Sequence, residues 1–207
     1  VLATVVAASG STPQKPGSSA LFLNGRLIAG TVGGGIVENN VSIYAARCTE
    51  AKESALLRFN LDNDTNDPEE AVCGGILSIL VDSDPFRSHQ VFREMADSLR
   101  KGRPGVLVTR VVSWNESTVL VSRCWATDEC EPHVPGNDDE RIAKEVKNIL
   151  SAGVRSGYRH LEMVIPGEEQ RATVFLEPVY PAQRLIIAGA GHVGRAVSHL
   201  GRLLGFE

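Results

Sequence analysis

The sequence predicts an α/β protein in two parts. A mixed α/β domain is expected over residues 1–180, and the beginning of a doubly wound parallel domain over residues 184–207. Strand-like apolar runs alternate with amphipathic helical patterns along most of the chain. A strand, a glycine turn and a helix then follow one another at its C-terminal end. Hydrophobic residues make up 43% of the 207 residues, which is enough to build a core.

The first elements are predicted to be strands. Residues 2–8 form an apolar, β-branched run that is typical of a buried strand. Residues 20–23 and 26–29 are joined by Asn24-Gly25, which favours a two-residue hairpin turn because both central residues need a positive φ.

Helices and strands alternate through the rest of the first part. Apolar residues at helical spacing predict helices over residues 37–56 and 91–99, and a third helix beginning at Asp138 or Asp139. The acidic residues 62–70 are predicted to be a solvated loop, and residues 178–183 a linker. Further strands are expected at residues 57–61, 76–81, 106–112, 118–122, 158–165 and 172–177.

Composition excludes several classes of protein. The net charge of −4 and the lack of a basic stripe argue against nucleic-acid binding. No apolar run is long enough to span a membrane, and no signal peptide is evident. The four cysteines form no paired CxxC pattern, so we expect no structural zinc site. The length and the enzyme-like composition of the chain favour a reducing, cytoplasmic setting over the alternative of a secreted protein with disulfides. The C-x₅-C-x₂-H spacing of Cys124, Cys130 and His133 lacks a fourth ligand. The chain begins with Val1 rather than Met, and a helical pattern is still running near Glu207. These two observations predict that residues of the natural protein are missing at both ends.

Residues 185–194 carry a dinucleotide-binding pattern of the Rossmann type. The apolar run 185–188 fits a central parallel strand, and Gly189, Gly191 and Gly194 then match G-x-G-x-x-G. The three glycines permit the tight turn, the approach of a pyrophosphate and close helix packing. His192 either faces a ligand or caps the helix. The acidic residue that would bind a ribose falls past Glu207, so NAD, NADP and no ligand at all remain alternatives.

Three glycine-bearing segments lie within the first eighty residues. They are Gly10-Ser11-Thr12-Pro13 with Gly17, Gly33-Gly34-Gly35 with Glu38, and Cys73-Gly74-Gly75. Each follows or precedes a strand-like run and can present backbone N–H groups to an anion. The second also precedes a helix N-terminus, whose dipole favours an anion. The alternative is that each is only a tight turn.

These segments, followed about a hundred residues later by I-I-A-G-A-G-H-V-G, resemble the xanthine dehydrogenase accessory family, XdhC/CoxI. The resemblance covers residues 2–81 and 185–207. It implies a cytoplasmic, bacterial-type maturation chaperone rather than a catalyst, with an N-terminal α/β domain and a Rossmann domain. Such a factor binds the molybdenum cofactor and supports its sulfuration or its insertion into a molybdenum hydroxylase apoenzyme. A cysteine desulfurase is a further implied partner.

The resemblance also assigns roles to residues. Ser11, Thr12 and the glycines of the three segments would contact phosphate, and Glu38 would bind a pterin N–H edge. Cys73 would ligate molybdenum or hold a sulfur in transit. The structural alternatives are turn capping for Ser11 and Thr12, a solvated first-turn carboxylate for Glu38, and an inert buried thiol for Cys73.

Two other functions remain open from the sequence. Gly189, Gly191 and Gly194 taken alone predict an NAD(P)-dependent oxidoreductase. If the glycine loops are purely structural, the chain would instead be a module that docks a partner enzyme. A homodimer is expected only from the general frequency of dimers among soluble proteins.

Overall fold

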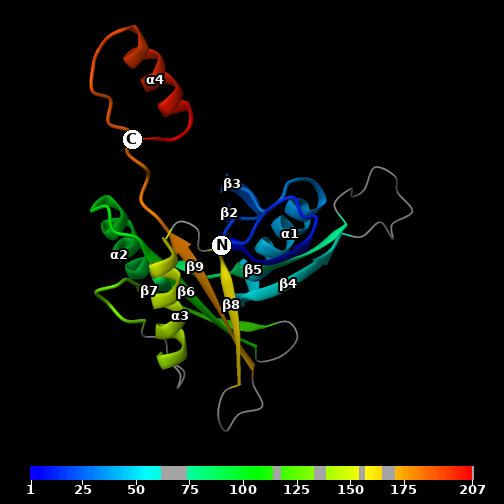
Figure 1. Ribbon diagram of the computed structural model, residues 1–207. Helices are drawn as coiled ribbons and strands as arrows, with labels where there is room; N and C mark the ends of the chain where they lie inside the picture. The colour runs from blue at the N-terminus through cyan, green and yellow to red at the C-terminus, as the bar shows by residue number, and fades with distance from the viewer. Residues whose placement is uncertain (62–73, 114–117, 133–138, 154–156, 165–170, 207) are drawn as a thin grey trace.

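We describe a computed structural model of the 207-residue chain, covering residues 1–61, 74–113, 118–132, 139–153, 157–164 and 171–206 (Figure 1). It confirms the mixed α/β class. The strands are β1 Leu2–Gly10, β2 Ser19–Leu23, β3 Arg26–Gly30, β4 Ala55–Asn60, β5 Gly75–Asp82, β6 Gly105–Ser113, β7 Val119–Ala126, β8 Arg159–Val164 and β9 Arg171–Val179. The helices are α1 Gly35–Ala51, α2 His89–Arg100, α3 Asp139–Ala152 and α4 His192–Leu203, with a short 3₁₀ helix, η1, at Pro85–Ser88.

The strands form two antiparallel sheets. The first has the order β3-β2-β1-β5-β4 and the second β7-β6-β9-β8. The predicted hairpin is confirmed, because β2 and β3 pair around Asn24 and Gly25, which have φ values of 50° and 73°. Between the two sheets, the backbones of Ser54 and Val119 form an isolated antiparallel β-bridge.

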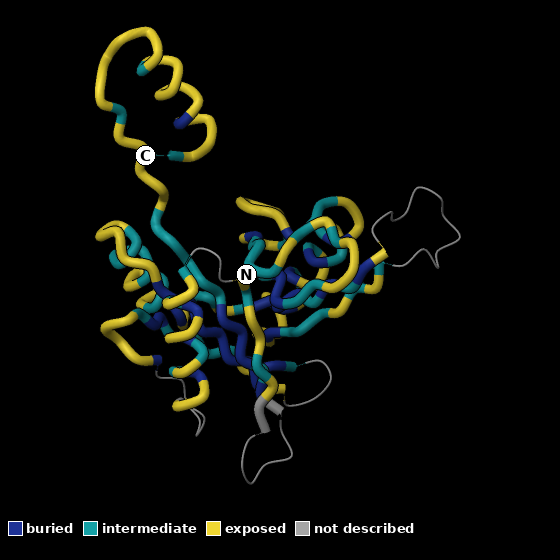
Figure 2. The backbone as a smooth tube through the Cα atoms, viewed as in Figure 1, coloured by how far each residue is buried: buried dark blue, intermediate teal, exposed yellow. Residues whose placement is uncertain are grey.

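Three apolar clusters hold the layers together. One lies between the first sheet and α1, where Val37, Val41, Ala45 and Cys48 recur at helical spacing on the buried face. A second lies between the other sheet and α3. The third joins the facing sides of the two sheets through Val6, Leu80, Val111, Val119 and Phe175. Figure 2 shows these buried strands at the centre of the molecule.

The prediction of a parallel unit is not supported. Residues 185–188, expected to be its first strand, form no strand, and both sheets are antiparallel. A parallel central strand exists only through hydrogen bonds to neighbours on both sides, and no described strand lies beside this run. The helix that follows does form, as α4, which is set apart from the sheets in Figure 1. The domain boundary near residue 180 stays a prediction.

Among the described residues, no helix combines the length and the apolar character that crossing a membrane requires.

Candidate functional site

The topology brings the three predicted glycine segments together where neighbouring strands of the first sheet begin or end. We call this end of the strands the glycine edge. In the β1–β5 ladder, Gly10 pairs with Gly75, so the end of β1 meets the beginning of β5. Strand β3 runs parallel to β1 across the hairpin, so its end at Gly30 faces the same way. Residues 10–17, 30–35 and 74–75 therefore leave the sheet on a common side.

The segments are in contact, and glycine is what permits the contact. A Cβ atom on Gly75 would lie 2.3 Å from the carbonyl oxygen of Ser11 and 2.8 Å from Cγ2 of Thr12. One on Gly33 would lie 2.9 Å from Cγ of Pro13. At such distances, a Cβ on Gly75 would force the backbone of Ser11 to move, and one on Gly33 would force the ring of Pro13 to move. The first segment thus packs on both of the others.

Gly75→Ala is expected to lower the free energy of unfolding by about 2 kcal/mol, because overpacking here involves backbone atoms that cannot rotate away. Urea unfolding measures the change. Gly157→Ala is the matched control, since nothing lies within 4 Å of a Cβ there. Equal stabilities for the two variants would contradict the close packing of the segments.

The second segment leaves an open cradle at the start of α1. Gly33, Gly34 and Gly35 have φ values of 138°, 68° and 51°, and nothing lies within 4 Å of a Cβ on Gly34 or Gly35. The N–H of Gly33 donates to Oγ1 of Thr31 at 3.2 Å. The N–H groups of the first helical turn have no partner within the helix, so they and the helix dipole suit an anion.

The polar side chains of the segments make local bonds. Oε2 of Glu38 accepts hydrogen bonds from Oγ1 of Thr31 at 2.8 Å and from the N–H of Val32 at 3.4 Å. Oγ1 of Thr12 donates to the carbonyl oxygen of Gln14 at 3.0 Å. Glu38 and Thr12 thus form hydrogen bonds with groups nearby in the chain, and their roles toward a ligand stay predictions. Ser11 is exposed, Gly74 precedes β5, and Cys73 lies outside the described residues.

The glycine turn before α4 has part of the predicted geometry. Gly189 has a φ of 128°, and a Cβ on Gly194 would lie 2.5 Å from the carbonyl oxygen of Gly189, so the helix packs closely on the turn. A hollow of about 560 Å³ beside the turn is lined by Arg195 and Arg202 among others. Gly191 is the N-cap of α4 and His192 is its first residue, so both alternatives for His192 stay predictions.

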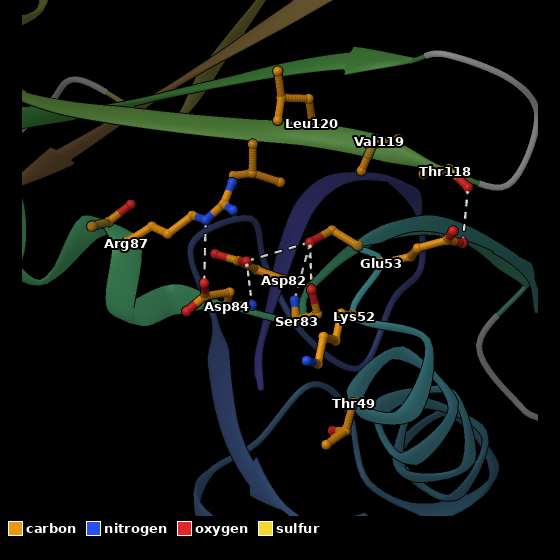
Figure 3. A pocket seen from close by; sticks show the side chains of 13 residues that line it. Thr49, Lys52, Glu53, Asp82, Ser83, Asp84, Arg87, Thr118, Val119 and Leu120 are labelled. Carbon is orange, nitrogen blue, oxygen red and sulfur yellow. Dashed lines mark hydrogen bonds and ion pairs between the residues drawn. The ribbon is translucent and has the colours of Figure 1, made fainter.

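A cleft of about 540 Å³ lies at the other end of β5 (Figure 3). Ser54, Asp82 and Ser83 form a hydrogen-bonded group on its wall, in which the N–H of Ser83 donates to Oγ of Ser54 at 3.1 Å. At its rim, Nε of Arg87 pairs with Asp84 at 3.2 Å. None of the predicted site residues that the structure describes lines this cleft.

The facing sides of the sheets hold charged groups that the sequence patterns did not single out. Arg123 of β7 forms an ion pair with Asp82 of β5, and their side chains are only 3% and 5% exposed. The guanidinium also lies 5.6 Å from the ring centroid of Phe92. Burial raises the pKa of nearby Glu177 to about 7, and the positive charge of Arg123 partly opposes this rise. The available signal was a charged residue at the end of, or directly after, an apolar strand pattern.

Among the described residues, no group of three or more His, Cys, Asp and Glu side chains could hold a metal ion. Cys124 is half-buried, Cys130 is exposed, and His133 lies outside the described residues.

Comparison with known proteins matches the resemblance found in the sequence. The model of the XdhC and CoxI family matches residues 1–60. A protein of Bacillus subtilis (strain 168), described as a probable subunit of xanthine dehydrogenase, is 24% identical over 209 residues, covering 100% of this chain and 57% of the relative. A crystal structure of a xanthine dehydrogenase from Bacillus halodurans has a TM-score of 0.65 at 21% identity, over 99% of this chain and 55% of that one. The structural likeness shows the fold, and the chain spans little more than half of either relative.

Proposed function

Since the resemblance of this chain to the XdhC and CoxI family is confirmed, we propose that it acts as an accessory factor for an enzyme of the xanthine dehydrogenase type. The supporting observation is the convergence of three separate glycine segments at the glycine edge of the first sheet. A module that only docks a partner does not require these segments to meet around an open helix N-terminus.

The ligand proposed for the glycine edge is the molybdenum cofactor. Its phosphate suits the N–H groups at the start of α1, because a helix N-terminus and positive-φ glycines bind anions without a basic surface. The open space at Gly34 and Gly35 leaves room for it. Glu38 already accepts two bonds through Oε2, so its contribution to a pterin edge would come from Oε1. When bound, the cofactor supplies a metal centre that prefers sulfur ligands, which is the proposed role of Cys73.

Under this proposal, the chain supports the sulfuration of the cofactor or its insertion into a hydroxylase apoenzyme. That apoenzyme and a cysteine desulfurase would be its partners. Pull-down of the apoenzyme by a chain that binds no cofactor would favour the docking module instead.

Cofactor released from a molybdenum enzyme is expected to bind the chain in equilibrium dialysis, measured by the molybdenum retained. The double variant Gly34→Val with Cys73→Ala is expected to bind at least about tenfold more weakly, because it loses both the anion cradle and the thiol.

Gly102→Val is the matched control for this experiment. Gly102 has a φ of 74° and nothing within 4 Å of a Cβ, so its replacement strains the backbone as at Gly34 but outside the glycine edge. The proposal is wrong if the wild-type chain retains no molybdenum, or if the double variant binds as well as the Gly102→Val control.

A second proposed function is NAD(P) binding at residues 189–194. The close packing of Gly194 on Gly189 favours it. NADH replaces the cofactor in the same dialysis, with Gly191→Val as the variant. Binding of NADH that this variant abolishes would support a dinucleotide site, and turnover of a small carbonyl substrate would support an oxidoreductase.

A further inference from the structure

A cavity of about 220 Å³ lies between the two sheets and α2. Most of its wall is apolar, with Leu2 and Val6 from β1 and Phe92 and Met95 from α2. Pockets for drug-sized ligands usually measure about 300–1,000 Å³, so this one suits a smaller molecule of one or two rings. In such pockets the apolar wall holds the body of the ligand, and a few polar groups fix its orientation.

The polar groups of the cavity lie close together on the second sheet. Arg123 of β7 is directly opposite Thr109 of β6, and Glu177 of β9 is opposite Leu107 of β6. Thr109 and Leu107 are two positions apart in their strand and therefore point to the same face. Tyr158 directly precedes β8, the neighbour of β9. All of these residues line the cavity, so the polar groups form a row across one of its walls.

These polar groups have unused hydrogen-bonding capacity. Thr109 is only 8% exposed, yet its hydroxyl forms no hydrogen bond with the residues that the structure describes. Within the same residues, no hydrogen bond reaches the carboxyl group of Glu177 or the hydroxyl of Tyr158. Arg123 forms its hydrogen bonds to described residues through Nη1 alone. Buried polar groups normally have partners, so a row without them in an apolar cavity points to a ligand.

The charges at the polar wall identify the group that such a ligand offers. Arg123 is already balanced by its ion pair with Asp82, so Glu177 is the acid in excess. Burial raises the pKa of Glu177 to about 7, although the positive charge of Arg123 opposes the rise. An ionised carboxylate accepts two N–H bonds, and a protonated one donates its O–H and accepts one N–H. In both forms the carboxyl group matches an amino group beside a ring nitrogen, with the proton on either partner.

We propose that this cavity binds a small aminated nitrogen heterocycle, a flat ring whose amino group is next to a ring nitrogen, as in several nucleobases. The amino group and the ring nitrogen meet the carboxyl group of Glu177, and the ring packs between Phe92 and the apolar side chains of β1. The Thr109 hydroxyl and the remaining N–H groups of Arg123 are left for other polar atoms of the ring. A purely apolar molecule would instead bury the polar row without partners. The site is separate from the glycine edge and does not rest on the proposed function.

The test is a ¹H–¹⁵N NMR titration of the full 207-residue chain at pH 7 with two probes. One is 2-aminopyridine, and the other is 2-methylpyridine, which has the same shape without the amino group. The amino compound is expected to shift the amide signals of Thr109, Arg123 and Glu177. It is also expected to bind at least about tenfold more tightly, because only this probe forms both hydrogen bonds with the carboxyl group.

Three variants locate the site. Glu177→Met keeps the length of the side chain and is expected to remove the preference for the amino compound, since methionine offers no carboxyl group. Thr109→Val keeps the shape and loses the hydroxyl, and is expected to weaken binding by about two- to tenfold. Glu162→Met is the matched control, because it replaces an exposed glutamate on neighbouring strand β8 and is expected to leave binding unchanged.

The proposal is overturned by equal affinities for the two probes, or by a preference for the amino compound that persists in Glu177→Met. It is also overturned if the three amide signals do not move at millimolar probe concentrations, or if the shifted signals lie outside the cavity. Neither probe carries a phosphate or a metal, so these results leave the proposed function of the glycine edge untouched. Failure of the chain to retain molybdenum in dialysis would likewise leave this site intact.

Discussion

Replacing Arg123 by methionine is expected to lower the free energy of unfolding by about 3–5 kcal/mol at pH 7. The substitution leaves the Asp82 carboxylate buried without its cation. Two weaker partners remain, Oγ of Ser54 at 3.4 Å and the N–H of Asp84 at 3.1 Å. A buried charge that loses its counter-ion costs far more than the loss of an exposed ion pair. Urea unfolding measures the difference.

Arg87→Met is the matched control for this substitution. Arg87 also pairs with an aspartate, Asp84, but the two side chains are 74% and 56% exposed, so the expected cost is at most about 1 kcal/mol. Adding Asp82→Leu to Arg123→Met is expected to recover part of the stability, because the unpaired charge is then absent. Similar losses in Arg123→Met and Arg87→Met would show that the buried ion pair is not the cause.

Glu177→Gln is expected to stabilise the fold at pH 9 by on the order of 3 kcal/mol and to have little effect at pH 4. Folding raises the pKa of this carboxyl from 4.5 to about 7, so between these values the folded state binds more protons than the unfolded state. The stability of the wild type therefore falls as the pH rises from about 4.5 to 7, and the full loss is present above pH 7. Glutamine keeps the shape of the protonated form and does not ionise.

Urea unfolding of both proteins at pH 4, 7 and 9 measures this difference. The gap between Glu177→Gln and the wild type is expected to open across the neutral range. A gap that is the same at all three pH values would show that glutamine acts through packing and that Glu177 ionises normally.

Local patterns predicted most of the elements because each depends on neighbouring residues. Asn24-Gly25 defined the hairpin, and the spacing of Val37, Val41 and Ala45 defined the buried face of α1. The helix was expected to run to residue 56 but ends at Ala51, where Lys52 adopts a left-handed conformation with a φ of 57°. Nothing in the residue types marks that end, because glycine is the usual residue there.

Features that depend on pairing between residues far apart in the chain could not be predicted from the sequence. The glycine segments were identified one by one, but their meeting follows from the β1–β5 register, which places Gly10 opposite Gly75. The ion pair of Arg123 with Asp82 joins residues 41 positions apart in facing sheets. At residues 185–188, a local pattern predicted a strand that does not form. An apolar run cannot form a strand without neighbouring strands to bond.

The glycine edge has walls of unequal stiffness. One wall begins β5, which has strands on both sides and packs against the core. The other follows β3, the last strand of the sheet, in which all five residues are exposed. Interior strands open only with the whole fold, whereas outer strands fluctuate at lower free energy. A ligand between them would therefore meet one fixed surface and one that can adapt to its size.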